Sequence, residues 1–247
     1  RQLSHAYRKI PNTVRILIAD LSDFNPDADM LPFEALPEID RWVISCMNDL
    51  TAKVRRAYDD YEFHIVYHEI SNFCTTELSK LYVDITKDRV YTEPAGSTAR
   101  RSAQTAMYFL LSGLIRLLAP ILVFSAEEMR QAIPHRSGDV RESVFLNALP
   151  SYDEALAFPE VRARWDRLFA MRDDVMKALE LARAAKMVGK SLEAKVTLYT
   201  ADDEMTALLE SFGKELNTVF IVSGVKLERG VAPADAQTEG SSGVGVL

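Results

Sequence analysis

Apolar side chains recur every three or four residues along about the first 150 positions, which is the spacing of helices that bury one face. Few residues interrupt this pattern, because the chain contains only 10 Gly and 10 Pro. Pro11 is expected to break or restart the first helix, and Ser125 with Glu128 forms a capping box that starts another. The helices predicted here cover residues 1–10, 14–21, 39–58, 63–85 and about 102–120, followed by the one beginning at Ser125.

One stretch is apolar enough to be compared with a membrane span. Residues 102–126 carry a single charge, on Arg116. The polar residues Gln104 and Ser112, together with Pro120, lie inside the stretch and not only at its ends. A helix that is apolar nearly all round is also what the centre of a large helical bundle requires. We therefore predict a buried helix and no membrane association.

The pattern changes after residue 150. Residues 159–188 are typical of one long charged helix, and a strand–helix–strand pattern follows it. The strands are expected at residues 192–200 and 217–227, with the helix at 201–216. The predicted fold class is mainly α: a helical bundle over residues 1–150, a long helix with a small α/β lobe over residues 151–229, and a flexible tail rich in Gly, Ala and Ser over residues 230–247.

Composition and charge narrow the class of protein. With 48% hydrophobic and 26% charged residues, the chain is typical of a globular protein with a substantial core. Its net charge of −7 means that a nucleic-acid site must be a local basic patch on an acidic body. Residues 20–40 contain 7 acids and no basic residue, and we expect a surface loop there. Cys46 and Cys74 lie on apolar helix faces and are expected to be reduced core residues.

Two short motifs are similar to known reaction centres. KMVGKS, at residues 186–191, is similar to the KMSKS loop of class I aminoacyl-tRNA synthetases, but no Rossmann pattern precedes it. Gly189 fits the left-handed position after a helix, so we interpret the motif as a helix end. His64 and His68 lie one helical turn apart, but the neighbouring glutamate falls outside the pair, unlike in HExxH. We predict no catalytic residue and no metal site.

The remaining candidate site is a cluster of basic side chains. Cationic side chains close the third helix and open the next, so the loop between these helices gathers them at one end of the bundle. Such groups beside aromatic rings suit single-stranded RNA, although exposed basic residues at helix ends are also common without a ligand. The group consists of Lys80, Lys87, Arg89, Arg100 and Arg101, near Tyr82 and Tyr91. A helical scaffold that binds a protein partner is the alternative, and the acidic residues 20–40 favour it.

An ordered set of longer motifs resembles one family. The chain contains, in order, LPEIDRWVI, NFCTTELSKLYVDITKDRVYTE, RRSAQTAMYFLLSGLIRLLAPILVFSAEE and RDDVMKALELARAAKMVGKSLEAKVTLY. Together they resemble the anticodon-binding region of isoleucyl-tRNA synthetases over about residues 3–227. The second motif and GKSLEAKV favour the isoleucine enzymes over the equivalent domains of valine, leucine or methionine tRNA ligases.

The resemblance implies that the parent protein attaches isoleucine to its tRNA, tRNA(Ile), using ATP and an aminoacyl-adenylate. The catalytic and editing domains, with ATP and magnesium, would precede Arg1, and a zinc element would follow Leu247 in some members. This chain would then bind tRNA without activity or cofactor of its own. Its expected partners are tRNA(Ile) and the other domains of the same parent chain. We expect a cytoplasmic monomer without membrane association.

The resemblance and the basic pattern together give the expected tRNA-contacting residues, which are Lys87, Arg89, Arg100, Arg101, Lys186 and Lys190. Arg116 is expected to have a structural role instead. Burying an unpaired guanidinium is unfavourable, so it should pair with an acid of a neighbouring helix, with Asp84 and Asp88 as candidates.

The chain departs from the family pattern in three places. Pro11 stands where a basic residue is usual, and Val123 replaces a proline. Met129 and Arg130 replace an apolar–tryptophan pair, which leaves open what this helix packs against.

Overall fold

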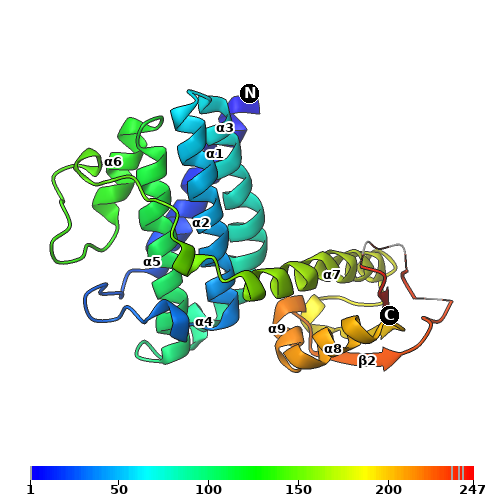
Figure 1. Ribbon diagram of the computed structural model, residues 1–247. Helices are drawn as coiled ribbons and strands as arrows, with labels where there is room; N and C mark the ends of the chain where they lie inside the picture. The colour runs from blue at the N-terminus through cyan, green and yellow to red at the C-terminus, as the bar shows by residue number, and fades with distance from the viewer. Residues whose placement is uncertain (1, 235, 239, 241) are drawn as a thin grey trace. The chain divides into compact units, whose positions relative to one another are not determined.

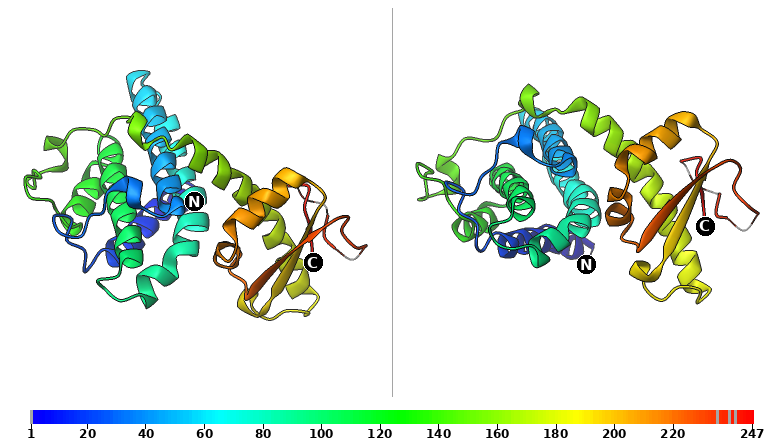
Figure 2. Two further views of the ribbon diagram at one scale, coloured as in Figure 1. Left: turned by 60° about the horizontal axis from the view of Figure 1, so that its bottom comes forward. Right: turned by 90° about the horizontal axis from the view of Figure 1, so that it is seen from below.

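The computed structural model describes residues 2–234, 236–238, 240 and 242–247. The chain separates into two units, Arg1–Val161 and Arg162–Leu247. Unit 1 is a bundle of helices, and unit 2 combines helices with a small sheet (Figures 1 and 2). The predicted mainly α fold with a small α/β lobe is confirmed. The division between the units falls after Val161, whereas the sequence pattern places it after residue 150.

The helices of unit 1 follow one another through connections of different lengths, of which those after α1 and α6 are long. α2 packs against both α3 and α5, and α1 packs against α5 (Figure 1). The bounds are α1 (Gln2–Asp20), η1 (Phe33–Ala35), α2 (Glu38–Asp59), α3 (Phe63–Phe73), the π-helical η2 (Cys74–Val83), α4 (Asp84–Thr92), α5 (Thr98–Leu118), α6 (Val123–Ala132), η3 (Val144–Leu146) and η4 (Glu154–Leu156).

Pro11 and Ser125 do not mark helix boundaries as expected. α1 continues through Pro11, because losing one backbone donor is tolerated while Ile10 and Val14 remain buried on the same face. α6 begins before Ser125, so the predicted capping box does not start it. Its first turn is closed instead by the backbone, where the N–H of Ala126 donates to the carbonyl of Leu122 at 2.8 Å.

The apolar stretch forms the buried interior of unit 1. α5 buries Leu110, Leu111 and Leu114 completely, and its polar residue Gln104 is also 0% exposed. Within the part of the chain that the structure describes, no helix has the length and apolar character that crossing a membrane requires. The apolar pattern is therefore accounted for by packing inside the bundle.

A single helical rod runs without a break from Phe63 to Thr92 through α3, η2 and α4. The sequence pattern predicts an ordinary α-helix that ends near Ile85. The structure differs in two respects, because the rod continues to Thr92 and contains a π-helical segment. Hydrogen bonds from i to i+5 widen a helix and shift the residues that follow around its axis. Cys74, in this segment, and Cys46 are free and buried, as expected.

A buried carboxylate ties α2 to this rod. Asp40, in the first turn of α2, is 0% exposed. The Nη1 and Nη2 atoms of Arg89 donate to its two oxygens at 2.9 and 2.7 Å, and the hydroxyl of Tyr82 donates to Oδ1 at 2.7 Å. Burial, followed by the negative charge of Asp40, raises the pKa of Tyr82 well above its usual value, so its hydroxyl stays protonated. Such a two-pronged pair compensates the buried charge and joins α2, η2 and α4.

Unit 2 is built on a parallel β–α–β connection. β1 and β2 pair in parallel from Lys195 opposite Gly224 to Thr200 opposite Arg229, and the sheet order is β2-β1-β3. The ring of Trp165, in the long helix, meets Phe212 edge-on at 5.2 Å in the core. The bounds are α7 (Pro159–Ala184), η5 (Ser191–Glu193), β1 (Lys195–Thr200), α8 (Asp203–Phe212), α9 (Glu215–Phe220), β2 (Gly224–Arg229) and β3 (Gly245–Val246).

One predicted strand in unit 2 is partly helical. The run 217–227 alternates like a strand, but its first residues belong to α9. Val219 and Phe220 are buried there together with Leu216, at helical spacing. The strand starts only at Gly224, after Ile221 turns the chain with a φ of 55°.

The segment 230–247 is more structured than the flexible tail that its composition predicts. Among its described residues, Gly245–Val246 form β3, which pairs antiparallel with β1. Val244 and Val246 are 2% and 3% exposed. The physical reason is that β1 offers an edge and the alternating valines supply apolar side chains that bury against the lobe.

Arg89→Met is expected to lower the free energy of unfolding by about 3–5 kcal/mol, because it leaves Asp40 buried without its opposite charge. Lys87→Met is the matched control on the same helix. Lys87 pairs with Asp84 at 2.9 Å, but their side chains are 42% and 36% exposed, so solvent screens the pair. Its loss should cost at most about 1 kcal/mol. Urea unfolding followed by circular dichroism measures both, and equal small losses would contradict the role given to Arg89.

Candidate nucleic-acid interface

The predicted basic residues lie on both sides of the loop that joins α4 to α5. Arg100 and Arg101 stand in the first turn of α5, and the side chain of Ser97 caps it by accepting from the Arg100 N–H at 3.1 Å. The first turn of a helix carries partial positive charge, and α5 has no acid there. Two arginines at this end therefore need negative charge from another part of the chain.

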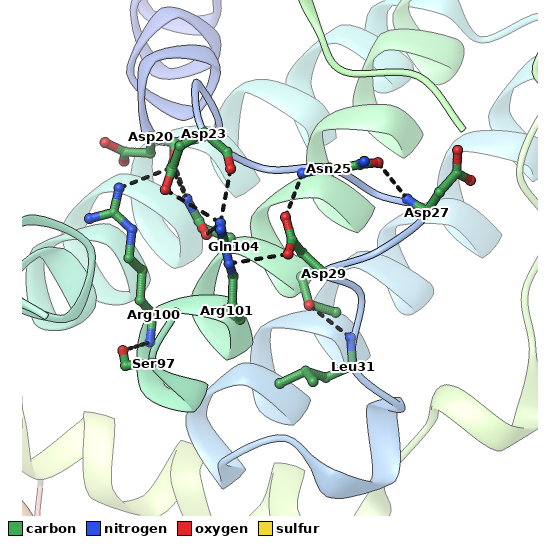
Figure 3. Close-up of polar contacts among 11 residues, drawn as sticks. Asp20, Asp23, Asn25, Asp27, Asp29, Leu31, Ser97, Arg100, Arg101 and Gln104 are labelled. Atoms are coloured by element: carbon green, nitrogen blue, oxygen red, sulfur yellow. Dashed lines mark hydrogen bonds and ion pairs between the residues drawn. The ribbon is translucent and has the colours of Figure 1, made fainter. Parts of the chain in front are cut away.

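The segment that follows α1 supplies this charge (Figure 3). Arg100 Nη2 donates to Asp23 Oδ1 at 2.9 Å, and Arg101 Nη1 donates to the Asp23 carbonyl at 3.1 Å and to Oδ2 at 3.4 Å. Arg101 Nε lies 3.5 Å from Oδ1 of Asp29. The arginine side chains are only 18% and 16% exposed. Carboxylates of the same chain therefore already hold both guanidinium groups.

Gln104 and Thr105 complete the attachment of the acidic segment, defined as residues 20–31, to α5. Gln104 Nε2 donates to the Asp20 carbonyl at 2.9 Å and to Asp23 Oδ1 at 2.7 Å. Its Oε1 accepts from Arg101 Nη1 at 2.7 Å, and Thr105 Oγ1 accepts from the Leu31 N–H at 3.1 Å. Sequence reasoning missed these contacts, because nothing local distinguishes Gln104 from any other polar residue of the stretch.

The acids of the segment respond to this environment in opposite directions. Partial burial alone would raise the pKa of Asp23, but hydrogen bonds from Arg100 and Gln104 and the charges of both arginines outweigh burial and lower it. Burial raises the pKa of Asp20 despite a hydrogen bond with Tyr91. Since the pKa of Asp23 is lowered, the stability from its pairing is present at neutral pH and lost only in acid, as the pH falls through that pKa.

Arg89 and Lys87, which belong to the same group, also have partners inside unit 1. Arg89 is bound to the buried Asp40, and its side chain is 21% exposed. Lys87 Nζ lies 2.9 Å from Asp84 Oδ1, and its side chain is 42% exposed. Lys87 therefore presents more of its side chain to solvent than Arg89 does.

The two tyrosines near the group differ in access. Tyr82 is 0% exposed, so it cannot stack on a base, and the expectation that it lies at a basic surface is wrong. Tyr91 is 66% exposed. Arg100 Nη1 donates to the carbonyl of Val90, which immediately precedes Tyr91 in the chain. The exposed ring of Tyr91 therefore lies close to the arginine pair.

Lys186 and Lys190 belong to unit 2, between α7 and β1. α7 ends at Ala184, which confirms that KMVGKS marks a helix end. The left-handed residue is Lys186, with a φ of 58°, and Gly189 has no positive φ, so its predicted role is wrong. The N–H of Met187 donates to the carbonyl of Ala182 at 2.9 Å and closes the helix end around Lys186. Both lysines are exposed.

Arg116 does not pair with Asp84 or Asp88, so the expected ion pair is wrong. Its Nε donates to the carbonyl of Ser112 at 3.0 Å, and its Nη1 donates to the carbonyl of Ala148 at 3.2 Å. The reason is that this face of α5 meets the segment that follows α6, and not α4.

The acidic stretch 20–40 is largely used inside unit 1. Asp23 and Asp29 hold the arginine pair, and Asp40 holds Arg89. Asp27 accepts hydrogen bonds from the backbone N–H of Ser137 at 3.0 and 2.9 Å. This stretch is therefore not a free acidic surface, which removes the main sequence argument for a protein-binding scaffold.

A family model described as the anticodon-binding domain of tRNA ligase matches residues 40–198. The isoleucine–tRNA ligase of Moorella thermoacetica is 47% identical over 229 residues, which cover 93% of this chain and 24% of that protein. The isoleucine–tRNA ligase of Symbiobacterium thermophilum is 44% identical over 249 aligned positions, which cover 100% of this chain and 26% of that protein.

That of Natranaerobius thermophilus is 44% identical over 93% of this chain and 24% of its own length. The chain thus spans about a quarter of the length of these relatives. The resemblance inferred from the motifs is confirmed. Because the matched residues 40–198 make up more than half of the 247, the chain belongs to the family of anticodon-binding domains of tRNA ligases.

Proposed function

We propose that this chain is the tRNA-binding part of an isoleucine–tRNA ligase, and that unit 1 binds the anticodon stem-loop of tRNA(Ile). One observation carries the proposal. Isoleucine–tRNA ligases are 44% to 47% identical to the chain over 93% to 100% of its length, so the similarity extends over both units. Sequence similarity of this extent supports a shared ligand as well as a shared fold.

Within unit 1, the proposed contact is the α4–α5 surface, formed by Lys87, Arg89, Arg100 and Arg101. Arginine suits a phosphate because its planar fork donates two parallel hydrogen bonds. The exposed ring of Tyr91 provides a face on which an unpaired base can stack. Lys186 and Lys190 are the proposed contact in unit 2, where both are exposed.

Binding at the α4–α5 surface would exchange one anion for another. Asp23 and Asp29 neutralise the arginine pair in the free protein, so an RNA phosphate has to replace them or add to them. The gain in free energy is then the difference between two charge-assisted interactions, increased by the release of counterions from the RNA.

For the whole protein, we propose that it attaches isoleucine to tRNA(Ile) with ATP, through an aminoacyl-adenylate. The catalytic and editing domains, with the ATP and magnesium that they use, would belong to the remaining three quarters of the relatives' length, as would a zinc element where one occurs. This chain alone should not activate isoleucine. The proposal also includes the expectations of a monomer and of a cytoplasmic location.

The purified chain is expected to bind tRNA(Ile) more tightly than an unrelated tRNA, which fluorescence anisotropy at two salt concentrations can measure. Higher salt should weaken both complexes, because phosphate contacts release counterions, whereas the preference that comes from base contacts should remain. Equal binding of the two tRNAs at both salt concentrations would contradict recognition of the anticodon. No binding at the lower salt concentration would contradict the proposed function itself.

Arg100→Ala combined with Arg101→Ala is expected to weaken tRNA(Ile) binding. If both side chains meet phosphates, the slope of log affinity against log salt should become shallower by roughly 0.7 to 0.9 per lost contact. A weaker affinity with an unchanged slope would instead indicate stacking on bases. Unchanged affinity would exclude the arginine pair from the interface and leave Lys186 and Lys190 as the better candidates.

Because the double alanine variant also releases the acidic segment, Asp23→Asn is the matched variant. It removes the charge that competes with RNA but keeps both arginines, so it should bind tRNA(Ile) more tightly than the original chain. Glu34→Gln removes the same charge from an exposed position in η1, which lies in the same connection between α1 and α2, and controls for net charge. If Asp23→Asn binds as weakly as the double alanine variant, order in the segment matters and the arginines themselves do not.

A further inference from the structure

A second basic site lies in unit 1, on the side of α5 that faces α6 and the segment after it. A pocket of about 330 Å³ opens there, and its lining includes Arg116, Arg130, Arg136 and Asp139. These residues come from α5, from α6 and from the connection between α6 and η3, so no short motif in the sequence reveals them. None of them belongs to the α4–α5 surface.

Arg130 is the most buried of these residues, because its side chain is only 4% exposed. Its Nη2 atom lies 3.3 Å from Asp139 Oδ2 and donates to the carbonyl of Val140 at 3.3 Å, which is long for a hydrogen bond. Its Nε atom is buried and has no hydrogen-bond partner among the described residues. A buried, charged donor without a partner is unfavourable, because no hydrogen bond compensates for its desolvation, so the charge of Arg130 is only partly compensated within the chain.

Arg116 adds a second guanidinium whose protein partners are uncharged. Its hydrogen bonds go to the carbonyls of Ser112 and Ala148. Burial first, and the positive charge of Arg130 second, lower the pKa of Arg116, although Asp139 opposes the shift. The two guanidinium groups therefore repel each other in a partly desolvated place, and an anion between them would relieve this repulsion.

The one acid that lines the pocket does not balance this charge. Three arginines and one aspartate line the pocket, and 3 − 1 leaves a net charge of +2. The carboxylate of Asp139 is already shared, because its Oδ2 also accepts from the backbone N–H of Arg136 at 3.1 Å. Two acids outside the lining, Glu127 on α6 and Asp27, interact electrostatically with Arg130 and Arg136 respectively. Hydrogen bonds already engage their oxygens, from Gln131, Ser143 and Val144 to Glu127 and from Ser137 to Asp27.

We propose that this pocket binds a phosphate-type oxyanion, held by Arg130 and Arg116 and covered by the exposed Arg136. Guanidinium groups match the oxygen spacing of phosphate, and a doubly charged phosphate matches the net charge of the lining. The anion can be free phosphate or a phosphate group of an RNA, since both offer the same oxygens. An acidic peptide offers single carboxylates and fits the charge less well.

Binding of inorganic phosphate to the whole chain tests the proposal, with phosphorus NMR line broadening as the readout at constant ionic strength. Phosphate should bind the original chain, and Arg136→Ser should bind it about tenfold or more weakly, because a charged hydrogen-bond donor is lost. Arg136 is exposed, so this variant should fold. Arg141→Ser is the matched control, since Arg141 is a nearby exposed arginine that does not line the pocket. Arg130→Met, checked for folding by circular dichroism, should abolish binding.

Competition then distinguishes the sources of the anion. Displacement of phosphate by an anticodon stem-loop RNA would assign the site to an RNA phosphate, whereas RNA binding without displacement would assign it to free phosphate, and both outcomes support the site. The proposal is overturned if phosphate does not bind the original chain, or if Arg136→Ser and Arg141→Ser weaken it equally. It is also overturned if a glutamate-rich peptide binds where phosphate does not. Phosphate binding does not require tRNA binding, so this test is independent of the proposed function.

Discussion

Neutralisation of charge at the helix ends is the constraint on which the arrangement of unit 1 depends. Arg100 and Arg101 occupy the first turn of α5, where the helix dipole repels cations. Asp23 and Asp29 neutralise this positive charge, and Gln104 donates a further hydrogen bond to Asp23. As a consequence, the connection between α1 and α2 lies against α5. At the first turn of α2 the charged residue of the helix is instead an acid, the buried Asp40, and the cation that neutralises it, Arg89, comes from α4.

This constraint also shapes what the surface can bind. Although the net charge of the chain is −7, a cluster of arginines without protein partners would bind any polyanion through charge alone. Here a carboxylate already occupies the arginine pair, so a ligand has to offer a better arrangement of oxygens than Asp23 does. Such competition lowers affinity in general and favours a ligand that also supplies base contacts, for which Tyr91 provides an open ring. The pocket between α5 and α6 differs in its charge balance, because three arginines and only one carboxylate line it.

The features that were predictable from the sequence are those carried by periodic patterns. The apolar spacing gave the main helices, the interpretation of residues 102–126 as a buried helix and the helix end at KMVGKS, because burial of one face imposes a period on local sequence. The partners of the charged residues were not predictable. Asp23 and Arg100 form an ion pair although they lie 77 residues apart in the chain. Arg116 donates hydrogen bonds to two backbone carbonyls and not to an acid. Lys186 could adopt the left-handed conformation in place of Gly189, because the hydrogen bonds of the helix end compensate its cost.

Hydrogen–deuterium exchange of the chain, with and without tRNA(Ile), tests most directly whether the α4–α5 surface is the RNA-binding surface. Exchange is expected to slow on binding in residues 87–101 and to change in residues 20–31, because RNA phosphates and the acidic segment compete for the same arginines. Both units report in the same measurement. Protection confined to residues 185–191, with residues 20–31 and 87–101 unchanged, would exclude the α4–α5 surface as the RNA-binding surface.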